Sequence, residues 1–299
     1  MKFNKILLLS LSMFMTVHAF AQDDLDDLLK DSKVENEKVF AKNAFKSTRV
    51  INGQSMEMLG KGVLDFRILH RFGMIKGGLQ ELFGLDQASM RMGFDYGISK
   101  DLGIGIGRST LNKELDGFVK YRIAHQHTGY KAFPISILWV SGMTFSTAKI
   151  TDTKLNTLAY RTAYFHQAIL GRKFSESFSL QLAPSYVHKN LVDTRSDKND
   201  ILALGIGSRL KISNRTAIVV DAHPILYGAN KNTQYLPLSI GVDIETGGHV
   251  FQLHVSNSRG MNEKAFIAET NQNWSKGEIN FGFNLSRVFT VVKNKDTSW

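Results

Sequence analysis

Charged residues stand at alternate positions in several stretches whose other positions are largely apolar. Charge that is withdrawn from water has to be paired or hydrated, so residues of this kind create a special environment when they share the inside of a protein. They could line a polar lumen that binds and conducts small solutes, or form a salt-bridged interior that conducts nothing. The candidates for this lumen-facing set are Asp65, Arg67, Arg91, Asp95, Lys120, Arg122, Arg209, Asp243 and Glu245.

Patterns for metal or cofactor binding are weak. His125 and His127 have a spacing that permits metal ligation, but no third ligand lies near them in the sequence. Gly103, Gly105 and Gly107 lack the G-x-G-x-x-G spacing of a dinucleotide site and lie in a strand pattern, where they would thin the interior of a barrel. The chain has no cysteine, which excludes thiolate metal sites and disulfides. The sequence therefore predicts neither a metal nor a cofactor.

Hydrolytic chemistry requires a nucleophile, a base and an orienting group within mutual reach. The sequence contains neither G-x-S-x-G nor H-E-x-x-H, although serines and histidines are plentiful. We predict that the protein is not an enzyme, and we keep an enzyme of the outer membrane that acts on lipid as an alternative.

The elements that must position these residues are strands, because the dominant hydrophobic period from about residue 62 onward is two. In the clearest stretch, Phe281, Phe283 and Leu285 share one face while asparagine, glycine and serine residues occupy the other. We expect strands near residues 62–72, 89–98, 102–109, 115–124, 134–146, 159–173, 178–190, 200–212, 216–225, 236–245, 249–257 and 278–289.

Short and long connections alternate between most of these strands. Tight turns are predicted at 99–101, 175–177, 213–215 and 246–248, and longer links at 73–88, 147–158, 191–199, 226–235 and 258–277. Bacterial outer-membrane barrels have short periplasmic turns and long outer loops, so the alternation favours that architecture. The link at 125–133 departs from the pattern, because it is longer than a tight turn although it falls on the inner side.

The predicted fold is all-β: a transmembrane, antiparallel, up-and-down β-barrel of about twelve strands. In hydrocarbon only helices and closed barrels satisfy the backbone, and charges interrupt every apolar run after the first. The apolar faces would then contact lipid and the charged faces would line the lumen. A soluble secreted β-barrel or sandwich that binds a ligand is the alternative, and it would place the aromatic rows inside.

The amino terminus predicts export to the outer membrane. Lys2 and Lys5 precede an apolar run, and Ala19-Phe20-Ala21 has the form of a signal cleavage site, so residues 1–21 are predicted to be a signal peptide. Residues 22–45 would form a periplasmic segment, 46–289 the barrel and 290–299 a carboxy-terminal tail.

The charge balance bears on partners. The chain has 37 Lys and Arg against 27 Asp and Glu, or 35 against 27 without Lys2 and Lys5. Because the basic residues are scattered and the chain is predicted to be exported, we expect no binding of nucleic acid. The excess of positive charge suits outer-membrane lipid head groups and small anionic solutes.

Two predicted loops have more than one interpretation. The apolar segment Leu79 to Phe83 could fold into the mouth as a constriction or form a helix on the rim. Residues 261–274 could form a lid or a partner-binding loop, or place Phe266, Ile267 and Trp274 at the level of the lipid head groups.

Several stretches carry a resemblance to a known family. They are FKSTRVINGQS from Phe45, GKGVLDFRILHRFG from Gly60, RMGFDYGISKDLGIGIGRS from Arg91, DGFVKYR from Asp116, SLQLAPSYVHKNLV from Ser179, PLSIGVDIETGGHVFQLHVSNSRGM from Pro237, FIAET from Phe266 and FGFNLSR from Phe281. With them the sequence resembles an uncharacterised outer-membrane β-barrel family of Bacteroidetes-type bacteria, the domain of unknown function fifty-seven seventy-seven. The resemblance implies a barrel and an export route, and it implies no activity and no functional residue. The predicted function is therefore that of an outer-membrane barrel of unknown specific role, either a narrow channel or a structural and docking component.

Overall fold

The computed structural model describes residues 37–149, 151–152, 156–192, 194 and 197–292. The predicted signal peptide lies outside the described residues, as do positions 22–36 and 293–299 of the predicted terminal segments. The described residues divide into two compact units, one of residues 37–41 with 126–134 and the other of the described residues from 42–125 and 135–292.

The smaller unit is a two-stranded antiparallel ribbon, β1 (Lys38–Phe40) and β6 (His127–Gly129). The Phe40 ring packs against the His127 ring with 5.3 Å between centroids. The Tyr130 amide donates a hydrogen bond to the Glu37 carbonyl at 3.2 Å. The predicted link at 125–133 is thus longer than a tight turn because it contains β6, one strand of this ribbon.

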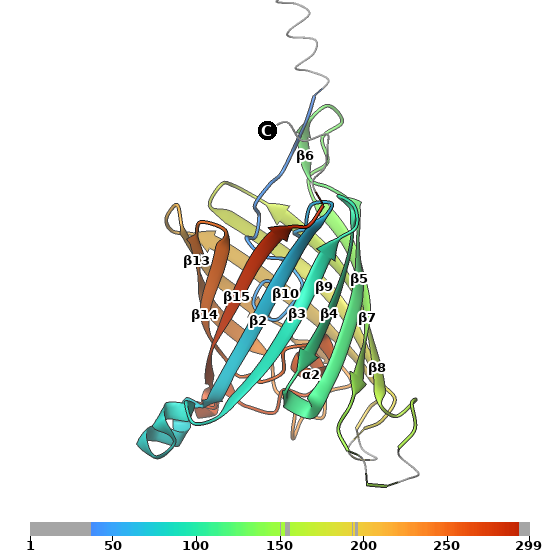
Figure 1. Cartoon of the computed structure of the whole chain (residues 1–299), viewed down its shortest axis with the longest axis vertical. Helices are drawn as coiled ribbons and strands as arrows, with labels where there is room; N and C mark the ends of the chain where they lie inside the picture. Colours follow the sequence, from blue (N-terminus) through green and yellow to red (C-terminus); the bar gives the residue numbers. More distant parts are fainter. Residues whose placement is uncertain (1–36, 150, 153–155, 193, 195–196, 293–299) are drawn as a thin grey trace, which may run out of the picture. The chain divides into compact units, whose positions relative to one another are not determined.

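The larger unit is one antiparallel sheet that closes on itself (Figure 1). Each strand pairs with its neighbours along the chain, and β15 pairs with β2 to close the ring. Its strands are β2 (Val63–Met74), β3 (Ala88–Gly97), β4 (Leu102–Ser109), β5 (Glu114–Ala124), β7 (Ser136–Ser146), β8 (Thr162–Lys173), β9 (Phe178–Lys189), β10 (Asp200–Lys211), β11 (Thr216–Ala222), β12 (Ile225–Tyr227), β13 (Leu238–Thr246), β14 (His249–Ser256) and β15 (Asn280–Thr290).

The prediction of twelve antiparallel strands is confirmed, with one interruption. β11 and β12 both pair with β10 and form a single wall strand that is broken at His223 and Pro224. Proline has no N–H to donate to the ladder, so the strand predicted at 216–225 cannot run through this position without a break. The remaining predicted strands agree with the observed bounds to within three residues.

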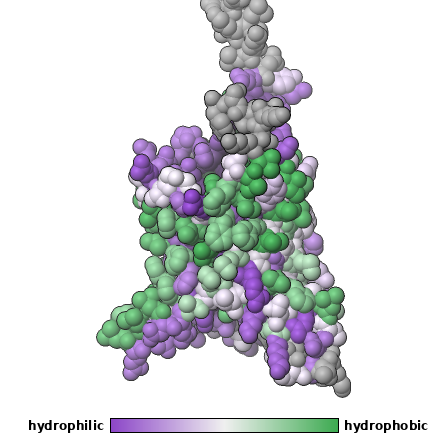
Figure 2. Space-filling view, in the orientation of Figure 1, coloured by the Kyte–Doolittle hydropathy of each residue, from purple (hydrophilic) through white to green (hydrophobic). Residues whose placement is uncertain are grey.

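The outer side of the wall is apolar. Ile106, Val119 and Leu253, for example, point outward with exposed fractions of 63%, 49% and 43%. Figure 2 shows hydrophobic residues gathered over the visible side of the wall. Outward apolar residues that alternate with inward polar ones are the pattern of a membrane barrel and are opposite to that of a soluble one.

None of the helices among the described residues is long and apolar enough to cross a membrane.

The connections divide the barrel into two ends. The tight turns predicted at 99–101, 175–177, 213–215 and 246–248 all lie at one end, which we call the turn end. The opposite loop end carries the longer links and four short helices. These helices are η1 (Ile75–Gly84), η2 (Leu111–Lys113), α2 (Glu263–Ala268) and η3 (Trp274–Lys276).

Two loop-end segments resolve the alternatives left open by the sequence. η1 lies on the rim, where Leu79 and Phe83 are 80% and 49% exposed, so it does not constrict the mouth. α2 instead folds inward. Phe266 and Ile267 are fully buried in it and contribute to the interior rather than to a belt at the head groups.

Candidate functional site

Residues 42–60, which precede the first wall strand, lie inside the barrel and are called the plug segment here (Figure 1). The plug turns back on itself, because the Val50 amide donates to the Gly53 carbonyl at 2.8 Å and the Ser55 amide donates to the Thr48 carbonyl at 2.9 Å. Asn-Gly is a strong tight-turn pair, and it stands here at positions 52 and 53. The sequence-predicted barrel began at residue 46, but the wall itself begins only at Val63.

One wall carboxylate holds the tip of the plug. Oδ2 of Asp221 accepts hydrogen bonds from the amides of Asn52 at 2.7 Å and Gly53 at 2.9 Å. The other oxygen of Asp221 lies 2.8 Å from Nε2 of His223. The His223 ring in turn contacts the Phe266 ring edge-on at 4.8 Å. The plug, the wall and α2 are therefore joined at the point where β11 is interrupted.

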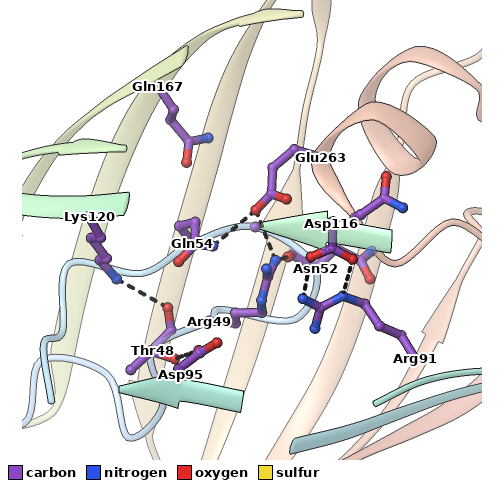
Figure 3. A network of polar contacts seen from close by, with 12 residues as sticks. Thr48, Arg49, Asn52, Gln54, Arg91, Asp95, Asp116, Lys120, Gln167 and Glu263 are labelled. Carbon is purple, nitrogen blue, oxygen red and sulfur yellow. Dashed lines mark hydrogen bonds and ion pairs between the residues drawn. The ribbon is translucent and has the colours of Figure 1, made fainter. Parts of the chain in front are cut away.

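The plug and α2 also meet directly in the middle of the lumen. Oε1 of Glu263 accepts from Nη1 of Arg49 and from Nε2 of Gln54, each at 3.0 Å (Figure 3). The side chains of Arg49 and Glu263 are both 1% exposed. The amino end of α2 is capped by Asn262, whose oxygen accepts from the Ala265 amide and whose nitrogen donates to Glu114 at 2.7 Å.

Most of the sequence-predicted lumen residues face this plug or pair beside it. Arg67 pairs with Asp65 and donates to the Thr48 hydroxyl at 2.8 Å. That hydroxyl donates to Asp95 at 2.8 Å. The Lys120 ammonium donates to the carbonyls of Glu57 at 2.8 Å and Thr48 at 3.3 Å. These four wall residues are thus neutralised or bonded by the plug and by one another.

Arg91 forms the most enclosed ion pair of the wall. Its Nε donates to Asp116 Oδ1 at 2.8 Å and its Nη2 donates to the other oxygen, while the residue is fully buried. A Cβ atom built on Gly107 would collide with this guanidinium, so the bare glycine of β4 makes room for it.

The remaining four residues lie in less uniform surroundings. Nε of Arg209 is 3.7 Å from a carboxylate oxygen of Asp243, which also accepts from Gln252 at 2.6 Å. Glu245 is only half-buried and pairs with Lys46 of the plug at 2.6 Å. Arg122 is also half-buried, near the turn end, with its Nη1 3.4 Å from Nδ1 of His125.

Several residues that complete the network were not among the sequence candidates. Asp116 and Asp221 occupy inward positions of predicted strands, so the rule that selected Asp95 could have selected them too. Arg49, Gln54 and Glu263 had no such signal, because they stand outside any strand pattern.

The wall from β7 to β10 presents apolar side chains to the lumen. The largest of them are Leu138, Val140, Phe165, Ile169, Val187 and Ile201, all 2% exposed or less. They form one cluster with Phe45, Val50 and Met56 of the plug and with Phe266 and Ile267 of α2. The plug and α2 therefore fill the lumen on this side mainly by apolar packing. Gln181 of β9 adds two hydrogen bonds to the plug, accepting from the Met56 amide at 2.8 Å and donating to the Gln54 carbonyl at 2.7 Å.

Outside the plug, the lumen widens at the loop end into a vestibule of about 940 Å³. Its floor includes Lys264 of α2, whose ammonium lies 2.6 Å from Glu114 and 2.9 Å from Glu269. Burial lowers the pKa of Lys264, but the two carboxylates outweigh burial and raise it overall. Burial raises the pKa of Glu269. A side cavity of about 150 Å³ shares Glu114, Lys189, Lys264 and Glu269 with the vestibule.

The described residues offer little for catalysis or metal binding. No group of three or more His, Asp or Glu side chains among them could hold a metal ion, and the two histidines considered above belong to different units. Ser141 Oγ lies 2.9 Å from Nδ1 of His166 on the outward face, and Trp139 donates to the same oxygen at 2.7 Å. Ser141 stands in the middle of β7, where an outward side chain of a membrane barrel meets acyl chains rather than the water that hydrolysis consumes.

Comparison with protein families agrees with this architecture. The model of a family described as a membrane bound beta barrel domain (DUF5777) matches residues 45–289. Among solved structures, the chain is similar to the NanC porin, at 10% identity over 75% of this chain and 98% of that one, with a TM-score of 0.47. It is similar to OmpT, an outer membrane protein of Vibrio cholerae, at 9% identity over 78% and 99% of the two chains, with a TM-score of 0.34. No curated protein matches the sequence.

Proposed function

The chain belongs to the DUF5777 family of membrane bound beta barrel domains, and from this premise we propose that it is an outer-membrane channel for small polar solutes that is closed at rest. In the outer membrane, the turn end faces the periplasm and the loop end faces outward. Solutes would enter the vestibule, and the plug and α2 would form the gate. The proposal assigns no catalytic activity to the protein.

The observation that carries the proposal is the polar junction beneath the vestibule. A vestibule of about 940 Å³ leads to α2, and α2 meets the plug through one carboxylate oxygen that accepts from Arg49 and Gln54. Water can replace hydrogen bonds of this kind during opening, whereas it cannot replace buried apolar contacts. A small shift of α2 or of the plug would therefore connect the vestibule to the lumen.

Conductance in planar lipid bilayers tests the proposal. We expect the wild-type protein to show rare or small openings. Glu263→Gln removes the partner of the buried Arg49, which destabilises the closed junction, so openings should become at least several times more frequent. Glu176→Gln is the matched control, because Glu176 lies on an exposed turn with its side chain 89% exposed.

A second variant protects the test against a change that merely disturbs folding. Gln54→Leu removes the second donor to Glu263 without leaving a charge unpaired, and it should increase opening less than Glu263→Gln does. Folded barrels would be verified by heat-modifiable gel migration. If both variants are folded and remain as closed as the wild type, the barrel has a structural or docking role and the channel proposal is wrong.

A further inference from the structure

We propose that the side cavity of the vestibule is a binding site for a small oxyanion, such as a carboxylate or a phosphate, with Lys189 as its main ligand. The inference names a ligand for the vestibule and so rests on the proposed function. It concerns equilibrium binding, however, which requires no open pore.

Lys189 is a buried cation that forms no ion pair with any carboxylate among the described residues. It is the last residue of β9 and is 4% exposed, and it lines both the vestibule and the side cavity. The backbone of Lys189 is fixed at both polar groups, because its amide donates to the Asn199 carbonyl at 2.8 Å and its carbonyl accepts from the Asn199 side chain at 2.6 Å. Within the described part of the chain, its ammonium forms no hydrogen bond or ion pair.

The charges around Lys189 do not neutralise it. Lys264 already engages both carboxylates of the side cavity, Glu114 at 2.6 Å and Glu269 at 2.9 Å. Arg161 is the third cation of the side cavity. Its Nη1 donates to the carbonyls of Ser146 at 2.9 Å and Ala148 at 2.7 Å, which are neutral acceptors. Three cations thus line the side cavity against two carboxylates, and Lys264 engages both carboxylates directly. Glu269, and Asp197 of the vestibule, attract Lys189 electrostatically, but neither forms an ion pair with it in the described part of the chain.

An ammonium held away from bulk water without an anion is unfavourable, and the favourable partner is an anion that can also accept hydrogen bonds. The side cavity has a volume of about 150 Å³. A single water occupies only about 10–15 Å³ on this measure, so a group of several heavy atoms fits. Hydroxyl groups of Thr144, Tyr160 and Thr162 line the same space and can bond the several oxygens of a carboxylate or phosphate.

The site is also placed for capture from outside. The vestibule opens at the loop end, and without Lys2 and Lys5 the chain has 35 Lys and Arg against 27 Asp and Glu, an excess of positive charge that raises the local concentration of anions. An anion at Lys189 would stand beside Lys264, whose own contacts tie α2 to Glu114 of β5. Binding would therefore neutralise the floor of the vestibule next to the gate.

Isothermal titration of the detergent-solubilised full chain with inorganic phosphate, and separately with gluconate, tests the inference. We expect saturable binding of at least one of the two, weakened about tenfold or more in Lys189→Gln and largely retained in Lys189→Arg. Lys231→Gln is the matched control, because Lys231 is an exposed lysine of a neighbouring loop and lines neither cavity. Heat-modifiable migration would show that each variant is folded.

Two results would overturn the inference: no binding of either anion by the wild type, or equal binding by the wild type and a folded Lys189→Gln. Neither result decides the channel proposal, which depends on conductance. Anion binding in a barrel that never conducts would support the site and contradict the channel. Conductance by a barrel that binds neither anion would support the channel and contradict the site.

Discussion

The two sides of the barrel wall line the same lumen with opposite chemistry. β2 to β5 and β13 to β15 point mainly ions, amides and hydroxyls inward, whereas most of the large side chains that β7 to β10 point inward are aliphatic or aromatic. Gln181, Lys189 and Arg209 are polar exceptions on the second side. Both sides keep apolar residues on their outer face, as contact with lipid requires. The difference therefore concerns the interior alone, and it determines what the lumen can contain.

The apolar side cannot border a water-filled pore without a cover, because exposing its side chains to water would be unfavourable. The plug and α2 provide the cover with Phe45, Met56 and Phe266. The polar side positions the same two segments through directional bonds, such as that from the Gln252 side chain to the Val50 carbonyl at 2.6 Å. One side thus contributes mostly apolar contact to the filled state, and the other contributes most of the directional bonds.

The largest expected effect comes from breaking an ion pair on the polar side. Arg91→Met leaves Asp116 buried without its partner, and we expect a loss of about 3–5 kcal/mol in the free energy of unfolding. The measurement is urea-induced unfolding in lipid vesicles, followed by tryptophan fluorescence.

The control replaces both partners. Arg91→Met combined with Asp116→Leu leaves no uncompensated charge, so it should regain most of the lost stability. If the double variant is as unstable as Arg91→Met alone, the guanidinium acts through packing against Gly107 rather than through its charge. Ion pairing would then not distinguish the polar side of the wall from the apolar side.

The next effect comes from the apolar side. Leu138→Ala opens a cavity between β7 and the filled lumen, and we expect it to lower the free energy of unfolding by about 3 kcal/mol. Leu170 is the matched control, because its side chain faces outward and the residue is 39% exposed. Acyl chains can close around the smaller side chain of Leu170→Ala, so its loss should be clearly smaller. Equal losses at both positions would mean that the apolar side is not tightly packed.

The sequence predicted the barrel well because the relevant signal is local. Alternation along each strand and the alternation of short and long connections depend on neighbouring residues only, so both survive without any knowledge of contacts. The same alternation placed Arg91 and Asp95 on the inner face. It was weakest for β7, where Leu138 and Val140 face inward while Trp139 faces outward, so both faces are apolar and the period is hidden.

The filling of the lumen could not be predicted in the same way. Arg49 and Glu263 are 214 residues apart, and neither lies in a strand that would indicate its direction. Asn52-Gly53 predicts a turn but not that the turn enters the barrel. Lys189 is inward by its position in β9. That it forms no ion pair among the described residues depends on how Glu114 and Glu269 of other segments are engaged by Lys264.

The smallest expected effect concerns the junction between the two sides. Asn262 caps α2 by accepting from the Ala265 amide at 2.9 Å and joins the cap to Glu114 of the polar side. Asn262→Ala removes both bonds, and loss of a cap costs about 1 kcal/mol. Because the apolar contacts of Phe266 remain, the helix should loosen without leaving the lumen. Hydrogen exchange at the Ala265 amide should accelerate about fivefold, while exchange in β7 stays unchanged. Equal acceleration in β7 would show that the cap supports the whole barrel and that the two sides do not act separately.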